Sequence, residues 1–333
     1  MKKLRAFLSF VVLYVASAQV AAAQSPAAPA TPETLLQRIK MVTVAAPDVA
    51  KIEALYTSAL GYTVREKGEV PEALARSWGA PKVAGRPYVV LSTDASPDVY
   101  IRAVQSAAPA DYKPMTSWGW TSFELIVDDI YALHKKLETT AFKVLGAPIP
   151  LKSSPSIVTV QVEGPGREIF YFANETGDRS KSNLPQPGAF VGRPFIVILA
   201  GRDITAVRDW YADLFLMKKN DIRSSGGKVV PRALGLPDGS SLPISLLGLK
   251  EFGNRIQLDG YLDHGVGARQ RLDGELPPGN AIVSFTVSSI DAIKAKPLTQ
   301  PITANSKTLN GLRVATLTGP AGELIELVEE KRP

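Results

Sequence analysis

The chain has 333 residues, of which 45% are hydrophobic and 21% are charged. This length allows two domains of about 150 residues, and the composition excludes a disordered, collagen-like or coiled-coil protein. Cysteine is absent from the sequence, which excludes disulfides, thiolate nucleophiles, iron–sulfur clusters and cysteine-bound zinc. The two histidines, His134 and His264, are too few for a multi-histidine metal site within one chain.

The start of the chain, from Met1 to Ala23, has the three-part pattern of a secretory signal peptide. A basic start precedes an apolar run over residues 6–18, and the alanines at 21–23 form a cleavage signal of the A-x-A type. The apolar run is short for a membrane span, which needs about 20 residues, although an uncleaved anchor is the alternative. We therefore expect cleavage after Ala23, a periplasmic or secreted location, and no association with the membrane afterwards.

Cleavage would remove three basic residues and no acidic ones, so the formal net charge would fall from +6 to +3. So weak a charge, without a basic run that contains aromatic residues, gives no indication of a nucleic-acid partner. Residues 24–36 are rich in proline and alanine and predict a flexible tether. An exported chain without cysteines has to be stabilised by burial of its core rather than by disulfides.

Three sequence blocks recur in the same order in the two halves of the chain, with nearly the same offset each time. Three matches in one order indicate two copies of one domain. The sequence thus predicts a first domain over residues 37–176, a linker over 177–192 and a second domain over 193–330. The matched blocks are residues 48–60 with 203–215, 70–74 with 230–234, and 164–169 with 319–324.

Each domain divides again into two halves. Both halves have the same order of elements, namely a strand, a helix and three further strands. In the first half, the β-branched run over residues 39–44 predicts the strand, and Asp48 is a suitable N-cap. Apolar residues from Val49 to Ala59 follow helical spacing, and Gly61 ends the helix. The sequence therefore predicts an α+β fold of four βαβββ units. Paired in chain order, these units would form two open-barrel cups, with helices outside and a concave face for a ligand.

Three motifs within this order carry a resemblance to a known family. They are Leu-Tyr-x-x-x-Leu-Gly-Tyr at residues 55–62, Phe-Glu-Leu-Ile-Val-Asp-Asp-Ile at 123–130 and Gly-Pro-Gly-Arg-Glu-Ile-Phe at 164–170. With the order of strands and helices, they resemble the glyoxalase/bleomycin-resistance/extradiol-dioxygenase group, the vicinal oxygen chelate superfamily. The resemblance covers residues 38–175 and, less closely, 193–329. Such folds host lyases, isomerases, dioxygenases and binding proteins, so the fold does not fix the function.

The resemblance implies a divalent metal, held by histidine or glutamine on the first strand of a half and by glutamate on its last strand. Only Gln257 and Glu326 are good donors at the positions that we place there, and two oxygen donors do not make a dedicated metal site. We therefore expect no metal and no cofactor, and a metal-dependent glyoxalase or dioxygenase is the weaker alternative. The first-strand positions are Met41, Ser122, Ile196 and Ile282, and the last-strand positions are Tyr100, Tyr171, Gln257 and Glu326.

Two residues are candidates for acid–base catalysis. Glu326 lies inside the last strand, where an apolar cup would raise its pKa and make it a general base. The alternative is a structural carboxylate held by an arginine or by water. His264 lies in a glycine-bearing loop at the end of a strand and is the best acid–base candidate by residue type, with an exposed loop residue as the alternative. His134 is expected at the surface of a helix.

The first cup is expected to be rich in aromatic side chains. By alternation along the strand, Trp118, Trp120 and Ser122 would share one face, and Tyr100 would share another with Arg102. These side chains could bind an aromatic ligand, or they could fill the cup as core. The second cup would carry a polar set that includes Glu326. The predicted ligand-binding residues are Tyr100, Arg102, Trp118, Trp120, Ser122 and Tyr171 in the first cup, and Gln257, Asp259 and Tyr261 in the second.

The sequence thus predicts an exported, metal-independent protein whose partner is a small apolar or aromatic molecule. A lyase or isomerase that uses Glu326 or a tyrosine as its acid or base is the alternative. Whether the protein is an enzyme, and how many copies assemble, stay open at this stage.

Overall fold

The structure is a computed structural model that describes residues 33–265 and 267–331. The predicted signal peptide, and the predicted tether up to residue 32, lie outside the described residues. Within those residues, seventeen strands form one sheet of eight strands and one of nine. No helix in this part of the chain is long and apolar enough to cross a membrane. The α+β fold class predicted from the sequence is confirmed.

The eight-stranded sheet combines strands from the two ends of the described chain. Its strands are β1 (Ile39–Ala46), β2 (Thr63–Glu69), β3 (Pro87–Ser92), β4 (Tyr100–Gln105), β14 (Gly279–Val287), β15 (Ile302–Ala304), β16 (Leu312–Thr318) and β17 (Leu324–Glu329). Their order in the sheet is β15-β16-β17-β14-β1-β4-β3-β2. β1 is antiparallel to β14 and parallel to β4.

The nine-stranded sheet contains the middle of the chain. Its strands are β5 (Gly119–Val127), β6 (Lys143–Val144), β7 (Ile149–Leu151), β8 (Ser154–Glu163), β9 (Ile169–Glu175), β10 (Val191–Gly201), β11 (Arg223–Gly226), β12 (Ser241–Gly248) and β13 (Arg255–Gly260). Their order is β11-β12-β13-β10-β5-β9-β8-β6, and β7 pairs with β8. β5 and β10 are antiparallel at the centre of this sheet.

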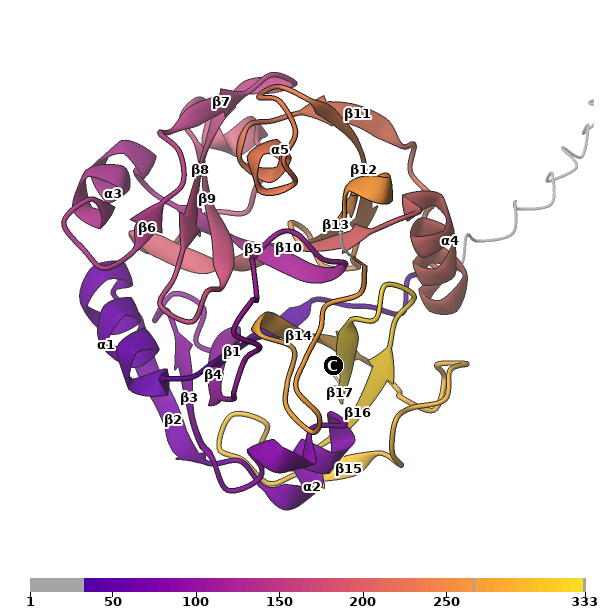
Figure 1. The fold of residues 1–333 in the computed structure, drawn as a ribbon. Coiled ribbons are helices and arrows are strands. Elements are labelled where there is room, and N and C mark those ends of the chain that lie inside the picture. Colours follow the sequence, from indigo (N-terminus) through magenta and orange to yellow (C-terminus); the bar gives the residue numbers. More distant parts are fainter. Residues whose placement is uncertain (1–32, 266, 332–333) are drawn as a thin grey trace, which may run out of the picture. The chain divides into compact units, whose positions relative to one another are not determined.

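The way the units pair differs from the expectation. We expected consecutive units to share a sheet, whereas β1 of the first unit pairs with β14 of the fourth, and β5 of the second pairs with β10 of the third (Figure 1). The first strand of each unit lies at the edge of that unit, so its backbone can pair with the first strand of any other unit. The repeat therefore identifies the units without specifying their partners.

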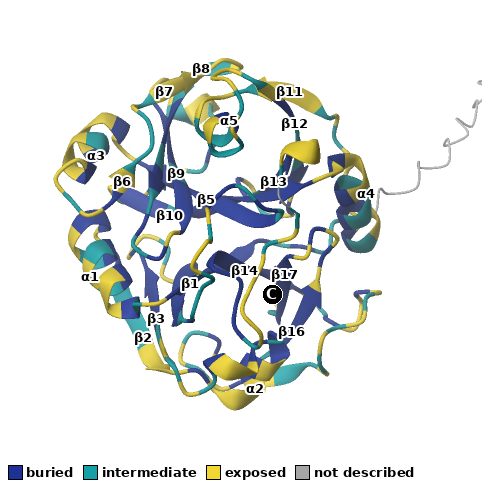
Figure 2. Cartoon of the chain, viewed as in Figure 1, coloured by how far each residue is buried: buried dark blue, intermediate teal, exposed yellow. Residues whose placement is uncertain are grey.

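Within residues 33–265 and 267–331, three long helices lie outside the sheets, and two further helices are short. α1 (Val49–Leu60), α3 (Ile130–Leu137) and α4 (Ile204–Phe215) are at the periphery in Figure 1. Their apolar residues join one core cluster that includes residues from both sheets. Figure 2 shows the central strands as buried and the outward sides of these helices as exposed. The remaining helices are α2 (Glu72–Ser77), α5 (Val229–Ala233) and 3-10 turns at Pro81–Val83, Arg179–Lys181 and Leu262–His264.

The ends of α1 are built as the sequence predicts. The side chain of Asp48 accepts a hydrogen bond from the Lys51 backbone N–H at 3.2 Å, which satisfies a free donor of the first turn. Gly61 follows the helix with a φ of 73°, and its N–H donates to the Tyr56 carbonyl. In the matching place after α4, Leu216 adopts the same left-handed region at a φ of 55°. The helices α1 and α4 therefore end in the same backbone geometry, at places that the sequence repeat matches.

The fourth unit lacks the helix that the βαβββ pattern predicts. Between β14 and β15 the described chain forms turns, in which the Ile293 N–H donates to the Ile290 carbonyl. Pro297 follows closely, and proline prevents a helix from continuing. Ile290 and Ile293 still enter the core cluster that the helices of the other units occupy.

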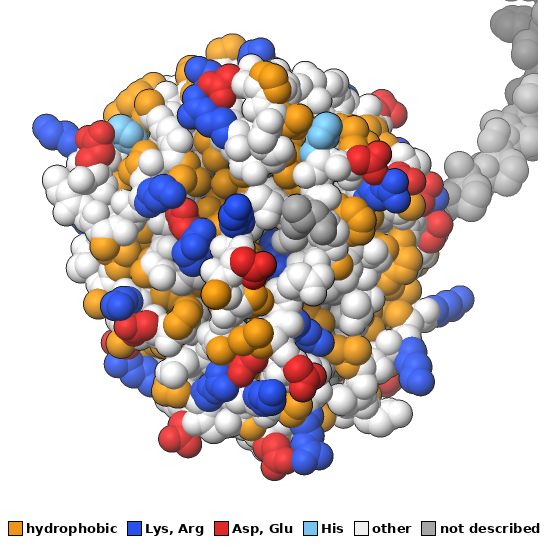
Figure 3. Space-filling view, viewed as in Figure 1, with side chains coloured by type: hydrophobic (Ala, Val, Ile, Leu, Met, Phe, Trp, Pro, Cys, Tyr) orange, Lys and Arg blue, Asp and Glu red, His pale blue; other side chains and the backbone are white. Residues whose placement is uncertain are grey.

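Each sheet has an inner face, opposite the long helices, on which a ligand could lie. Face A is the inner face of the eight-stranded sheet and carries Thr43, Arg102, Ser284 and Glu326. Face B is the inner face of the nine-stranded sheet and carries Glu124, Tyr171, Ile198 and Gln257. On the surface drawn in Figure 3, basic and acidic side chains are interspersed rather than gathered by sign.

Candidate functional site

Face A is organised around a buried ion pair between Arg102 and Glu326. Glu326 is 0% exposed, and its Oε2 atom lies 3.2 Å from Arg102 Nη2. Glu326 also accepts hydrogen bonds from Trp78 Nε1 at 2.7 Å and from Ser284 Oγ at 2.5 Å. The Arg102 guanidinium lies 4.4 Å from the centre of the Trp78 ring and donates through Nε to Thr43 Oγ1 at 3.0 Å. The charge and the lone pairs of Glu326 are therefore satisfied within the protein.

Packed segments close face A. Leu74 of α2 and Trp78 lie in an apolar cluster with inner-face residues of the sheet. Thr308 donates through its backbone N and its hydroxyl to Glu66, at 2.8 and 2.6 Å, which fastens the loop before β16 to β2. The space left beside Trp78 and Arg102 holds about one water molecule. Face A is thus a filled core, and Glu326 is held by an arginine as the structural alternative expected.

The strand register revises three of the eight positions that the resemblance placed. Ser284, rather than Ile282, lies opposite both Met41 and Glu326. Glu124, rather than Ser122, lies opposite Tyr171. Arg255, rather than Gln257, lies opposite Ile196. The expected positions were counted back from the aspartate after each strand, but the helix N-caps Asp48 and Asp129 lie at different distances from the central positions Met41 and Glu124.

The donors at these positions do not fit the metal that the fold family implies. Each inner face offers one carboxylate at its centre, and no histidine lies there. Within residues 33–265 and 267–331, no three side chains of the histidine, cysteine, aspartate or glutamate types come together. On face A the guanidinium of Arg102 already occupies the cationic position beside Glu326. Transition-metal sites need more nitrogen or carboxylate ligands than either face provides.

Face B carries two buried carboxyl groups instead of an ion pair. Glu124 on β5 is 8% exposed, and none of the described groups donates a hydrogen bond to it. Asp259 on β13 is 6% exposed, and its Oδ1 atom accepts a hydrogen bond from Gln257 Nε2 at 2.9 Å. The two acids lie on strands separated by β10.

Burial shifts the protonation of both acids. It raises the pKa of Glu124 to about 7, a shift to which the charge of Asp259 adds and which Arg255 opposes. Burial also raises the pKa of Asp259 to about 6, and the hydrogen bond from Gln257 limits this shift. The pKa of the Tyr171 hydroxyl lies far above its usual range, because the group is buried beside these two acids. Near neutral pH, face B therefore holds an acid that exchanges its proton.

Solvent reaches face B more readily than face A. Tyr171 and Gln257 are half-buried, and so are Ile244 and Leu246 on the neighbouring strand β12. The register places Leu246 opposite Gln257 and Ile244 opposite Asp259, so these apolar side chains lie beside the polar group. An apolar surface with a few converging polar groups is the usual composition of a small-molecule site.

One end of face B contains two unpartnered polar groups. Tyr261 is 0% exposed, and among the described residues its hydroxyl has no hydrogen-bond partner. The indole Nε1 of Trp118 also lacks one within that part of the chain. Both rings belong to an apolar cluster with Ala200 and Leu242, against which residues of α5 and its flanks pack. Tyr261 is followed by Leu262, which has a φ of 49°, a left-handed conformation that is costly for leucine.

Trp120 does not lie on face B. Ser122 lies opposite Ile198 while Trp120 lies opposite Leu199, so Thr121 forms a bulge that reverses the alternation. The Trp120 ring lies 6.1 Å from that of Phe285, and its Nε1 donates to the Leu324 carbonyl at 2.8 Å. The expectation that Trp118, Trp120 and Ser122 share one face is therefore wrong. Trp120 instead packs in the core between the two sheets.

The predicted cups also exchange members. Tyr100 and Arg102 lie on β4 in the eight-stranded sheet, together with Glu326, whereas they were expected to share a cup with Tyr171. This follows from the pairing of the first unit with the fourth. The remaining predicted residues of face B, on β5, β9 and β13 or at their ends, are Trp118, Ser122, Tyr171, Gln257, Asp259 and Tyr261.

The histidines lie away from the two acids of face B. His264 is exposed in the turn after Tyr261, and its backbone N–H donates to the Tyr261 carbonyl at 2.9 Å. His134 lies on α3, where its Nε2 atom is 3.9 Å from Glu138. Both positions agree with the surface alternatives that the sequence allowed.

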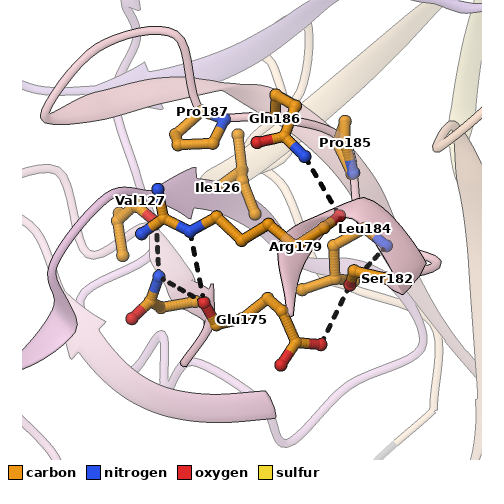
Figure 4. Close-up of a pocket in the computed structure, with 10 residues that line it drawn as sticks. Ile126, Val127, Glu175, Arg179, Ser182, Leu184, Pro185, Gln186 and Pro187 are labelled. Carbon is orange, nitrogen blue, oxygen red and sulfur yellow. Dashed lines mark hydrogen bonds between the residues drawn. The ribbon is translucent and has the colours of Figure 1, made fainter. Parts of the chain in front are cut away.

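The connector between the second and third units covers the other end of face B. Leu184 packs with Ile126, Ile196 and Ile198 in one apolar cluster. Figure 4 shows Arg179 lying across a small pocket at this place, where its Nε donates to the Glu175 carbonyl. The pocket holds about one water molecule, and its polar side chains are bonded to the connector. This pocket fastens the connector and is not a ligand site of useful size.

Glu124 is the residue that the sequence interpretation missed. It stands in the Phe-Glu-Leu-Ile-Val motif that carried the resemblance, but only Ser122 was considered there. Its signal was a single acid in a strand that is buried along its whole length. A charged residue at such a position is rare unless it is paired or functional.

Comparisons with known proteins agree on the fold. No family model matches the chain, and no curated protein does. Among solved structures, glyoxalase I from Zea mays matches with a TM-score of 0.55 at 18% identity, covering 88% of this chain and 92% of that one. A putative dioxygenase from Bacillus subtilis matches with a TM-score of 0.58 at 12% identity, covering 89% of this chain and 85% of that one. The chain therefore has a glyoxalase-like fold, with two curled half-barrel sheets that fit two domains of that type.

Proposed function

We propose that the protein binds a small, largely apolar molecule on face B, while face A serves as structural core. The observation that carries this proposal is Glu124, which is 8% exposed and whose carboxyl group accepts no hydrogen bond from the described residues, beside half-exposed apolar side chains. A carboxyl group whose hydrogen-bonding capacity is unused within the protein is a natural contact for a bound molecule. Face A differs in this respect, because its carboxylate, that of Glu326, has an ion pair and two hydrogen bonds within the protein.

A metal-independent isomerase or lyase is the second candidate, with Glu124 in place of Glu326 as the proton carrier. The pKa of Glu124, about 7, favours it, because a group that is half-ionised at neutral pH both accepts and returns a proton. The charge of Asp259 raises the pKa of Glu124, and the charge of Glu124 raises the pKa of Tyr171. Asp259 and Tyr171 are therefore the further groups that could exchange a proton with a bound substrate.

Export is part of the same proposal. The pattern from Met1 to Ala23 supports a periplasmic or secreted protein whose mature chain starts at Gln24. Edman sequencing of protein recovered from the periplasmic or culture fraction tests it. A cytoplasmic protein that keeps its first residues would contradict export without affecting the proposal for face B.

Native mass spectrometry of the protein from its own cells tests the binding site. Leu246→Arg places a long charged side chain on face B, and Leu272→Arg is the matched control because Leu272 is already 42% exposed. We expect a small molecule to co-purify with the wild type and with the control variant, and to be absent from Leu246→Arg. Retention of the molecule by a folded Leu246→Arg protein would overturn the assignment to face B.

A further inference from the structure

The two inner faces can be compared position by position, because their strands pair in the same register. On face A, Thr43 lies opposite Arg102 and Ser284 lies opposite Glu326. On face B, the corresponding pairs are Ile198 with Gln257 and Glu124 with Tyr171. In the sequence repeat, Arg102 matches Gln257 and Tyr171 matches Glu326, at the same offset that relates Asp48 to Asp203.

The comparison shows that the arginine stands elsewhere on face B, where Arg255 takes the position of Tyr100, and that face B has gained an acid. A carboxylate stands at the centre of each face, but the guanidinium that neutralises it on face A is replaced by the uncharged amide of Gln257. The position of Val104, a buried apolar residue on face A, is taken by Asp259 on face B. Both acids of face B therefore lack the ion pair with arginine that Glu326 has on face A, and the charge of Asp259 raises the pKa of Glu124.

The neighbouring cation does not replace Arg102. Arg255 lowers the pKa of Glu124, but its Nη2 atom donates to the Asn183 carbonyl of the connector at 3.4 Å, and no ion pair joins it to either acid among the described residues. Separately, Tyr261, two residues beyond Asp259 along the chain, keeps a fully buried hydroxyl without a partner in that part of the chain. The two carboxylates of face B accept hydrogen bonds only, and within the described residues just one hydrogen bond, from Gln257 to Asp259, reaches them.

We infer that the molecule bound on face B is an organic cation, an amidine, guanidine or amine on an apolar body, whose N–H groups donate to Glu124 and whose charge Asp259 also favours. This inference rests on the proposed function of face B. The ligand cation would take the role that Arg102 has on face A. Charge-assisted hydrogen bonds would make the site bind a cation more tightly than a neutral molecule of the same shape. The apolar body would lie on Ile244 and Leu246.

Benzamidine and benzamide provide the test, because they have nearly the same shape and differ in charge. At a pH of about 8 both acids are ionised, and isothermal titration should show benzamidine binding at least tenfold more tightly than benzamide, with benzoate weakest. Glu124→Gln should remove most of this preference, and Asp259→Asn should reduce it. Glu138→Gln, at an exposed acid that directly follows α3, is the matched control and should leave this preference unchanged.

Methyl NMR of the isoleucines distinguishes the two ways in which the test can fail. If none of the three probes shifts the Ile244 methyl signal, the proposed site itself fails. If benzamide shifts this signal with the same affinity as benzamidine, the site stands and the cation preference is overturned. A folded Glu124→Gln variant that keeps the wild-type preference would overturn it as well. Because a neutral amide replaces a buried acid of similar shape, this variant is expected to fold.

Discussion

Tyr56 and Glu168 form a buried hydrogen bond between two units that belong to different sheets. The Tyr56 hydroxyl donates to Glu168 Oε1 at 2.8 Å, and at the matching place of the repeat Tyr211 donates to Glu323 Oε1 at 2.7 Å. Each glutamate also accepts a backbone N–H of its own turn, from Gly166 or Ala321. Consecutive units therefore contact each other through this bond, while their sheets pair with other units.

Removal of the tyrosine hydroxyl should destabilise the protein at both places. Tyr56→Phe and Tyr211→Phe each leave a fully buried glutamate short of a donor, and we expect each to lower the free energy of unfolding by about 1–3 kcal/mol. Urea unfolding measures this loss. Tyr131→Phe, at a ring that is 58% exposed, is the control, and a loss no larger than that of the control would contradict a stabilising role for the bond.

Stability should fall as the pH rises from about 5 to 8. Burial raises the pKa of Glu168 and of Glu323 to about 7, and it raises the pKa values of Glu124 and Asp259 in the same direction. An acid with a raised pKa in the folded state binds more protons there than when unfolded. Its stabilising contribution is present below the unfolded pKa and is lost as the pH rises through the folded value.

The midpoint of urea unfolding, measured across this range, tests the sign. Glu124→Gln should flatten the dependence of the midpoint on pH, because the variant no longer titrates at that position. Asp259 and Arg255 are the charged groups that influence the pKa of Glu124, and Glu124 in turn raises the pKa of Tyr171. Glu330 does not interfere, since Lys40 and Arg38 lower its pKa to about 2, outside the window. A midpoint that rises with pH between 5 and 8 would show that these acids are not shifted as described.

The Arg102–Glu326 pair should act as a structural unit. Arg102→Met leaves a buried, unpaired carboxylate and should cost about 3–5 kcal/mol of unfolding free energy, whereas the Arg102→Met/Glu326→Met double variant should recover much of this loss. A double-mutant cycle in urea measures the coupling. Binding of benzamidine on face B should be the same in the double variant as in the wild type. If a folded Glu326→Gln protein lost binding or turnover, the catalytic role expected for Glu326 would return.

Much of the fold could be predicted because its signals are local. Asp48 and Gly61 mark the ends of α1 through backbone geometry that depends on a few neighbouring residues. The pairing of β1 with β14 could not be predicted in this way, because it joins segments from opposite ends of the described chain through backbone groups that every residue has. Repeats show which segments are alike and leave open which of them meet.

The site was predicted only in part, for a similar reason. Asp259, Gln257 and Tyr171 were assigned to inner faces correctly, since strict alternation holds along their strands. Trp120 was misplaced because the bulge at Thr121 depends on the contact with β10 and has no marker such as glycine at that position. The register error at Glu124 arose from a shorter link between strand and helix in the second unit.

The two tryptophans of this region should respond differently to one substitution. Trp120→Phe removes an indole that donates to the Leu324 carbonyl at 2.8 Å in the core. The lost hydrogen bond should lower the free energy of unfolding by about 1–3 kcal/mol, in addition to the effect of the smaller ring. Trp118→Phe removes an indole N–H that has no partner among the described residues, so it should cost less. Urea unfolding of the two variants checks this difference, and equal losses of stability would show that the Trp120 hydrogen bond contributes little.

Benzamidine binding should be unchanged in Trp120→Phe, because that ring lies behind face B. Isothermal titration of the variant checks this expectation. A weakened affinity in Trp120→Phe alone would instead return this residue to the ligand site from which the bulge at Thr121 removes it.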